Sequence, residues 1–114
     1  MRLHTLGYIR ATTWRPQLYH RDIPLSHIGE SYSVFSPVNV RCPDGETNGS
    51  RWRDERGEEH PMGSDPGDVF IMDSRTPHRG GGKPRNCKGF RYIPFAAITE
   101  IGKPNPDYDI TVPL

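Results

Sequence analysis

Proline and glycine are the residues that most restrict how this chain can fold. They contribute 12 residues each to a chain of 114 and occur along its whole length. Proline removes a backbone hydrogen-bond donor and glycine weakens a helix, so frequent copies of both end helices early. Short extended segments joined by turns are the structure that this composition favours.

Alternating apolar and polar residues indicate where the extended segments lie. β-branched and aromatic side chains recur at every second position in six stretches, and none has helical periodicity. The expected strands are residues 3–13, 14–23, 31–40, 67–74, 90–101 and 108–112. In the fifth stretch, Arg91, Ile93, Phe95 and Ala97 would share one face. We therefore expect an all-β barrel or sandwich.

Residues 41–67 interrupt this rhythm with a polar, turn-rich sequence. The stretch exceeds the roughly 12–15 residues beyond which structureless loops become uncommon and are usually functional or disordered. We expect one domain over residues 1–114, with this loop as a lid that offers Trp52 to a ligand. From about residue 102 we expect an irregular tail.

Charge and hydropathy argue against several classes of partner. Fifteen basic residues balance fourteen acidic ones, and the net charge of +1 provides no global field toward nucleic acid or an anionic membrane. No segment approaches the roughly 18 apolar residues needed to span a bilayer. Cys42 and Cys87 have no CxxC spacing and are expected to be unpaired thiols, which suits a soluble, intracellular protein.

The segment QLYHRDIP, residues 17–24, contains the first candidate metal ligands. His20 and Asp22 are two positions apart and would face the same side of a strand. Five histidines and fourteen acidic residues make one such pair close to a chance occurrence. The pair needs partners elsewhere in the chain before it indicates a site.

A third candidate ligand, His78, lies in the segment DSRTPHRGGG. Thr76 precedes a proline and is biased toward an extended conformation, while glycines 80–82 would let the chain turn sharply. If His78 lies near His20 and Asp22, two imidazoles and one carboxylate would form the facial triad of non-haem Fe(II) oxygenases. Arg91, which alternation would place on the inner face of the next strand, could bind a carboxylate through two hydrogen bonds.

Four segments in order, QLYHRDIP, YSVFSPVNV, GDVFIMDSRTPHRGGG and FRYIPF, resemble one protein family. They are similar to the phytanoyl-CoA dioxygenase-like branch of the Fe(II)/2-oxoglutarate-dependent oxygenases, and DSRTPHRGG is the most specific part. The resemblance implies a double-stranded β-helix, a jelly-roll-like, cupin-type barrel with iron at its open end. It also implies that His20, Asp22 and His78 bind the iron, and that Arg91 binds the far carboxylate of 2-oxoglutarate.

The implied activity is that of a dioxygenase using Fe(II), 2-oxoglutarate and O2 to hydroxylate a C–H bond of an unidentified small molecule or side chain. Asp22 favours hydroxylation, since related halogenases lack this carboxylate. Arg85 competes with Arg91 for the 2-oxoglutarate carboxylate, and Thr76 either adds a hydroxyl contact or is an ordinary strand-end residue. Gln17 faces away from His20 on alternation and would at most support the site.

The resemblance also leaves alternatives open. Only 16 residues precede Gln17, where the family has a longer region, so the barrel is expected to be incomplete or minimal. A homo-oligomer or a protein partner would cover the missing N-terminal wall. The chain would otherwise be a non-catalytic barrel subunit, retaining the site residues for binding or assembly. A zinc site with the same three ligands is a further alternative.

Overall fold

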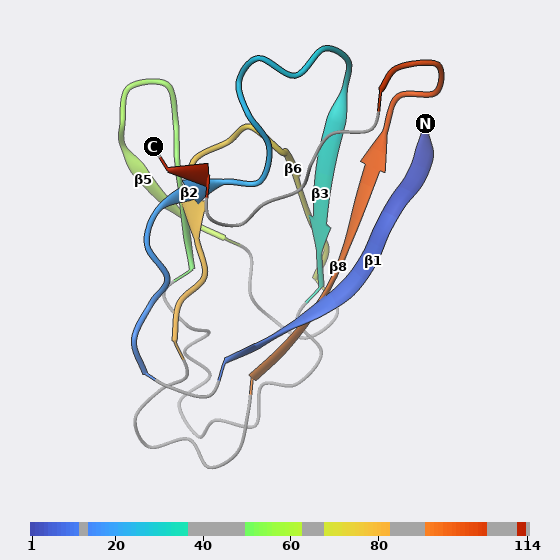
Figure 1. Cartoon of the computed structure of the whole chain (residues 1–114). Coiled ribbons are helices and arrows are strands. Elements are labelled where there is room, and N and C mark those ends of the chain that lie inside the picture. The colour runs from blue at the N-terminus through green and yellow to red at the C-terminus, as the bar shows by residue number, and fades with distance from the viewer. Residues whose placement is uncertain (12–13, 37–49, 63–67, 83–90, 105–111, 114) are drawn as a thin grey trace.

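The protein folds as two antiparallel β-sheets that face each other (Figure 1). The computed structural model describes residues 1–11, 14–36, 50–62, 68–82, 91–104 and 112–113. Among these residues there is no helix, in agreement with the all-β expectation. Within the same residues, no helix long and apolar enough to cross a membrane is found.

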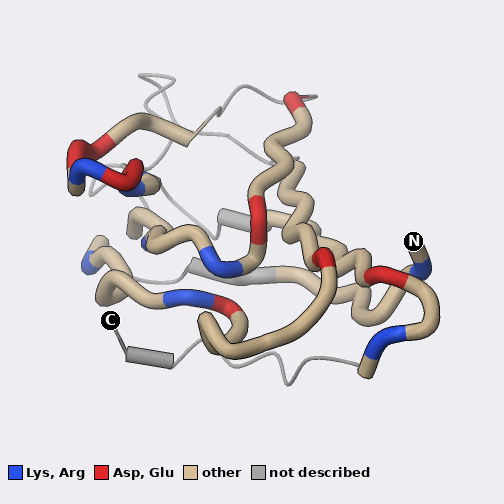
Figure 2. The backbone as a smooth tube through the Cα atoms, turned by 90° about the horizontal axis from the view of Figure 1, so that it is seen from above, with Lys and Arg blue, Asp and Glu red and all other residues tan. Residues whose placement is uncertain are grey.

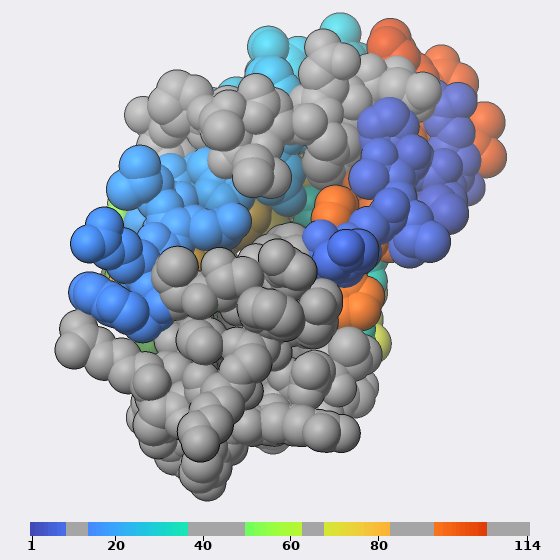
Figure 3. Space-filling model, turned by 60° about the horizontal axis from the view of Figure 1, so that its bottom comes forward, coloured from blue at the N-terminus to red at the C-terminus, as the bar shows by residue number. Residues whose placement is uncertain are grey.

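The larger strands form a four-stranded sheet in the order β1–β8–β3–β6. Its strands are β1 (Arg2–Ala11), β3 (Ser31–Phe35), β6 (Phe70–Asp73) and β8 (Arg91–Thr99). Figure 3 shows β1, in dark blue, along one edge of the molecule beside the orange β8. β1 continues through Gly7, where the ring of Phe95, its cross-strand partner, occupies the space that a Cβ would need.

Shorter strands form a five-stranded sheet in the order β5–β4–β7–β2–β9. Its strands are β2 (His20–Arg21), β4 (Arg51–Arg53), β5 (Glu59–Pro61), β7 (His78–Arg79) and β9 (Val112–Pro113). Each of these strands has only two or three residues, so loops determine much of this sheet. The last strand lies at the end of the stretch expected at 108–112, and residues 105–111 are outside the described part.

The core lies between the two sheets. Phe35, Met62, Met72 and Ile93 form its buried cluster, and three partly buried aromatic residues pack against it: Trp52, Phe70 and Phe95. Ile93, Phe95 and Ala97 alternate toward this side of β8, as their spacing predicts. A cluster this small leaves room for polar residues in the interior, and several serines fill it.

The strand expected at 14–23 is mostly absent. Only His20 and Arg21 belong to a strand, and Leu18, which strict alternation would place on the same face as His20, is 88% exposed. Pro16 has no backbone donor, and the backbone and side chain of Gln17 instead bond to Gly80. These two bonds hold the segment along the glycine-rich stretch instead of within a regular ladder.

The expected loop at 41–67 contains a hairpin made by β4 and β5, so the prediction of a structureless lid is wrong for residues 51–61. One Asp54 carboxylate oxygen accepts hydrogen bonds from the backbone N–H groups of Arg56 and Glu58. Gly57 follows with φ +81, a conformation that glycine adopts without strain. Figure 2 shows how closely acidic and basic residues alternate in this turn.

Candidate metal centre

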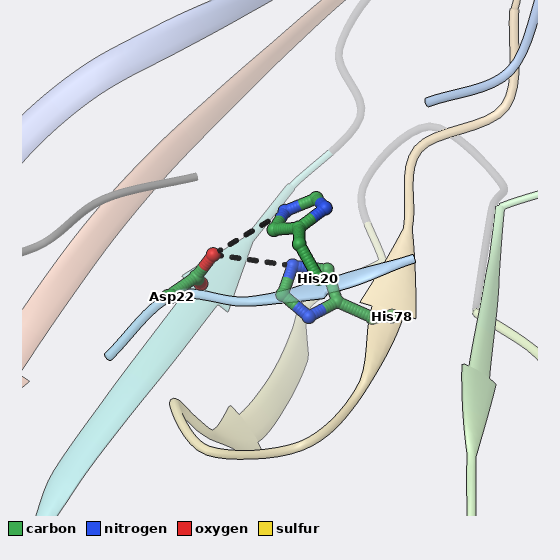
Figure 4. Close-up of side chains that lie close together, drawn as sticks. All are labelled: His20, Asp22 and His78. Atoms are coloured by element: carbon green, nitrogen blue, oxygen red, sulfur yellow. Dashed lines mark ion pairs between the residues drawn. The ribbon is translucent and has the colours of Figure 1, made fainter. Parts of the chain in front are cut away.

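Three potential metal ligands meet between the sheets. His20 on β2 and His78 on β7 are direct cross-strand partners, with ring centroids 4.4 Å apart. Asp22 follows β2, and Figure 4 shows its carboxylate pointing toward both imidazoles. The ligand atoms of the three residues all lie within 4.8 Å of one another. The strand pairing thus brings together the His-x-Asp pair and the distant histidine, as the sequence predicts.

The distances suit a shared ion better than direct hydrogen bonds. Asp22 Oδ1 lies 3.6 Å from His20 Nε2 and 3.3 Å from His78 Nε2. Both separations exceed the usual hydrogen-bond length. Ligand atoms each about 2.1 Å from one metal ion lie roughly 3.0–3.4 Å apart at angles of 90–110°. A small inward adjustment would therefore let all three residues hold an ion.

Each histidine is oriented by the main chain. Nδ1 of His20 lies 2.8 Å from the carbonyl oxygen of Leu18, and Nδ1 of His78 lies 2.8 Å from that of Thr76. A carbonyl only accepts, so each Nδ1 must carry the proton and each Nε2 keeps its lone pair when the ring is neutral. Outer hydrogen bonds of this kind fix the tautomer of metal-binding histidines.

Asp22 is oriented by buried serines. Ser33 donates a 2.8 Å hydrogen bond to Asp22 Oδ2, which leaves Oδ1 facing the two imidazoles. Because the single hydroxyl proton of Ser33 goes to Asp22, the 2.9 Å contact between Ser33 and Ser74 must be donated by Ser74. Ser31 in turn donates to Ser74. The three hydroxyls form a directed chain that ends on the carboxylate.

Burial and nearby charge shift the pKa values of Asp22 and His20 in opposite directions. Burial by itself would raise the pKa of the Asp22 carboxyl, but contacts with His20 and His78 and the Ser33 bond hold it well below its usual value. Burial would lower the pKa of His20, yet Asp22 and the Leu18 carbonyl raise it. The carboxylate is therefore charged and the imidazole basic, as metal ligands require.

The side chains of all three residues are nearly inaccessible, with His20, Asp22 and His78 5%, 6% and 4% exposed. The ring of Phe35, from the opposite sheet, lies 6.0 Å from that of His78. An apolar wall beside the imidazoles limits water near the ligand atoms and strengthens their interaction with a cation. Two imidazoles and a carboxylate can hold a first-row divalent metal, and the set suits Fe(II) and zinc alike.

The remaining residues singled out from the sequence contribute differently. Thr76 reaches the site through its main-chain carbonyl, which orients His78, and its hydroxyl makes no described contact with the three ligands. Arg91 is the first residue of β8, where it pairs with Ala11; its side chain is outside the described part of the chain. Arg85, like Cys42 and Cys87, lies outside the described residues altogether.

The glycine-rich segment after His78 differs from the expected sharp turn. None of glycines 80–82 has a positive φ; among the described glycines only Gly29, Gly57 and Gly102 do. A Cβ on Gly82 would lie 2.2 Å from the carbonyl carbon and oxygen of Trp14. Glycine is needed here because two backbone segments approach closely, and the approach places the chain before His20 beside the chain after His78.

The buried serines are the site residues that sequence reasoning missed. Ser31, Ser33 and Phe35 alternate inward along β3. The same period-2 pattern that predicted the strand could have placed both serines on the inner face, opposite the His-x-Asp segment. Their side chains are short enough to sit beside the carboxylate without filling the space for an ion.

A second group of possible ligands, Asp54, Glu58 and His60, lies in the β4–β5 hairpin. Asp54 Oδ2 is 2.8 Å from Nε2 of His60, whose ring stacks on Trp52 at 4.5 Å, while Oδ1 accepts two backbone bonds. These contacts close the turn and occupy both carboxylate oxygens. We therefore assign them a structural role.

Comparison with known proteins adds no relative to this description. No protein-family model matches the chain, and no curated protein is significantly similar to it. The chemistry of the site has to be judged from its own geometry.

Proposed function

We propose that the protein is an Fe(II)- and 2-oxoglutarate-dependent dioxygenase that hydroxylates a C–H bond of a small molecule or side chain. The observation that carries the proposal is the convergence of His20, Asp22 and His78, with both Nε2 lone pairs and Oδ1 directed to one point. Three protein ligands on one side of an ion leave further positions open for a co-substrate and O2. The order of the motifs, which resembles the phytanoyl-CoA dioxygenase-like branch, supports the same assignment.

The two facing sheets are consistent with a β-sandwich, and we propose that they form a small double-stranded β-helix. In that fold the metal lies between the sheets, near one end of the barrel. The position of His20 and His78 on adjacent short strands, opposite Ser33 and Phe35 of the other sheet, supports this arrangement.

Bound Fe(II), together with 2-oxoglutarate and O2, would supply the oxidising power for the reaction. The protein would hold the ion through His20, Asp22 and His78 and keep their tautomers and charges fixed by the outer hydrogen bonds. Arg91 would bind the far carboxylate of 2-oxoglutarate with its planar guanidinium, with Arg85 as the alternative. Phe35 would keep water from the reacting centre.

The decisive experiment is anaerobic addition of Fe(II) and 2-oxoglutarate to the metal-free protein. We expect a visible charge-transfer band that needs both additions, and succinate on admission of O2. Asp22→Ala should abolish the band, Arg91→Ala should weaken it, and His27→Gln, a histidine outside the site, should leave it unchanged. A folded protein that gives no band would overturn the enzyme assignment. Tight zinc binding without that band would favour the zinc alternative.

An exposed apolar surface supports a second candidate function, assembly with another copy of the chain. On the outer face of the four-stranded sheet, Leu6, Ala96, Val34 and Ile71 form one row across all four strands. Leu6 is 74% exposed and Ile71 61%. At the edge, β1 pairs only with β8 among the described strands and so offers backbone groups for pairing with a second β1. This surface would serve a non-catalytic barrel subunit as well as an enzyme.

A further inference from the structure

We propose that the outer face of the five-stranded sheet binds a phosphate-bearing small ligand between Arg51 and Arg79. This basic face, comprising Arg21, Arg51, Arg53 and Arg79, lies on the opposite side of the sheet from the metal centre. The proposal concerns a separate site and does not depend on the proposed dioxygenase function.

The sheet register places the arginines together. Arg51 pairs directly with Arg79, and Trp52 pairs with His78. Successive residues on a strand point to opposite faces. Since His20, Trp52 and His78 point toward the core and the metal centre, the arginines that follow or precede them point outward. Arg21 follows His20, and Arg51 and Arg53 flank Trp52.

In the described part of the chain, this face carries an excess of positive charge. Among the described residues its four arginines have one carboxylate nearby, that of Glu59, which lies 4.0 Å from Arg53, interacts electrostatically with Arg51 and Arg79, and accepts a hydrogen bond from Tyr19. The whole chain has a net charge of only +1. Like charges directly opposite each other on adjacent strands destabilise a sheet. An anion bound between Arg51 and Arg79 would remove this repulsion.

Few acceptor groups of the protein compete with a ligand for these guanidinium groups. In the described part of the chain, Arg51 bonds only to the neutral carbonyl of Ser50, and no carboxylate lies within ion-pair distance of Arg21, Arg51 or Arg79. The Nε atoms of Arg21 and Arg79 are buried and have no hydrogen-bond acceptor among the described residues. Unsatisfied donors of this kind are uncommon in folded proteins and are costly to leave unpaired.

Two of the four arginines, Arg53 and Arg79, are also held in place before any ligand binds. The guanidinium carbon of Arg53 lies 3.7 Å, and that of Arg79 5.1 Å, from the centre of the Tyr19 ring. Stacking reduces the rotamer entropy that a long side chain loses on binding. The Tyr19 hydroxyl is fixed in turn by Glu59.

Phosphate is the anion that this arrangement fits best. A guanidinium presents parallel N–H donors that match phosphate oxygens in pairs. Opposed residues on adjacent strands are roughly 5 Å apart, so two forks can bind neighbouring groups of a diphosphate. The strands are only two or three residues long, which limits the basic face to a compact area and favours a small ligand over a nucleic-acid duplex.

The test uses the metal-free full chain and inorganic pyrophosphate, titrated by calorimetry at low ionic strength. We expect saturable binding that weakens with added salt and weakens at least about tenfold in the double variant Arg51→Gln/Arg79→Gln. The matched control is Arg56→Gln, which removes an exposed arginine of the same hairpin and should leave the affinity unchanged. Asp22→Ala should also bind pyrophosphate normally, which separates this site from the metal centre.

Charge-conserving variants cover the case in which the glutamine variant does not fold. Arg51→Lys/Arg79→Lys retains the positive charge but loses both planar forks, so it should fold and still bind pyrophosphate several-fold more weakly. The proposal would be overturned if the natural chain showed no saturable binding, or if both double variants bound pyrophosphate as tightly as the natural chain. Binding to a DNA oligonucleotide but not to pyrophosphate would also overturn it in favour of a nucleic-acid surface.

Discussion

The hydroxyl of Ser33 donates to Oδ2 of Asp22 over 2.8 Å and so determines which carboxylate oxygen faces the two histidines. Ser33 lies on the four-stranded sheet, whereas Asp22 follows a strand of the five-stranded sheet. This single bond therefore couples the packing of the two sheets to the geometry of the candidate metal centre. Ser74 and Ser31 extend the coupling through their own hydroxyls.

Replacing Ser33 by alanine should weaken metal binding without removing a ligand. Asp22 Oδ2 would lose its only described side-chain donor, and the carboxylate would be free to rotate. Outer hydrogen-bond partners of metal ligands typically contribute 10- to 100-fold to affinity, so we expect a loss of at least about tenfold. Anaerobic Fe(II) titration measures the effect, with the exposed Ser26→Ala as the control. Affinity within twofold of the natural chain would show that Ser33 does not position Asp22.

Metal affinity should fall on acidification through the pKa of His20. Contacts with Asp22 and the Leu18 carbonyl outweigh burial and raise this pKa above its ordinary value of about 6.5. A protonated imidazole cannot bind a metal, so below that pKa affinity should drop about tenfold per pH unit. Asp22, whose pKa is lowered, stays ionised over this range. Dissociation constants measured between pH 8 and 5.5 test the slope.

In the metal-free protein, the contribution of His20 to folding stability should change with pH in the opposite sense to metal affinity. Because the folded-state pKa of His20 is raised, its stabilising contribution is complete below the unfolded value of about 6.5 and is lost as pH rises through the folded value. The contribution of Asp22 is present above about pH 3.9 and is lost as pH falls through its lowered folded value. Denaturant unfolding across this pH range, on the natural chain and on Asp22→Asn, measures both contributions to stability. Both should be absent from the variant.

Glycine substitutions should separate close packing from backbone strain. Gly82→Ala would place a Cβ against the Trp14 carbonyl. The backbone at Trp14 cannot move aside without disturbing the nearby Gln17–Gly80 hydrogen bonds. We expect a loss of at least about 2–3 kcal/mol in the free energy of unfolding. Gly57→Ala meets no neighbour within 4 Å and suffers only from its φ of +81, which costs about 1 kcal/mol. Urea unfolding of both variants gives the order, and a larger loss at Gly57 would contradict this account.

The sequence predicted the grouping of the three candidate ligands better than it predicted the five-stranded sheet. His20 and Asp22 could be found because both are buried two positions apart, although alternation fails on either side of them, where Leu18 is exposed and Ile23 is fully buried. The β4–β5 hairpin could not, since its strands of three residues carry charged side chains outward and only Trp52 and His60 inward. Its stability comes from the Asp54 turn and from pairing with β7, which is a tertiary contact.

The glycines after His78 illustrate a second limit. A run of three glycines predicts conformational freedom, but the reason for Gly82 is the backbone of Trp14, 68 residues earlier in the chain. Nothing local to the run indicates that approach. Ser33 is similar, because its inward position follows from alternation, whereas its partner Asp22 is determined only by how the two sheets stack.

The outer face of the four-stranded sheet gives a final prediction, about self-association. If Leu6, Val34, Ala96 and Ile71 meet the same row of a second copy, the chain should sediment as a dimer at micromolar concentration. Leu6→Lys would place a charge within that contact and should shift the chain to monomer, because burying an unpaired charge is costly. Leu18→Lys is the matched control, since Leu18 is also highly exposed, at 88% against 74% for Leu6, but lies on the segment before β2. This surface would be ruled out as the contact if the natural chain remained monomeric at high concentration, or if Leu6→Lys and Leu18→Lys both abolished the dimer.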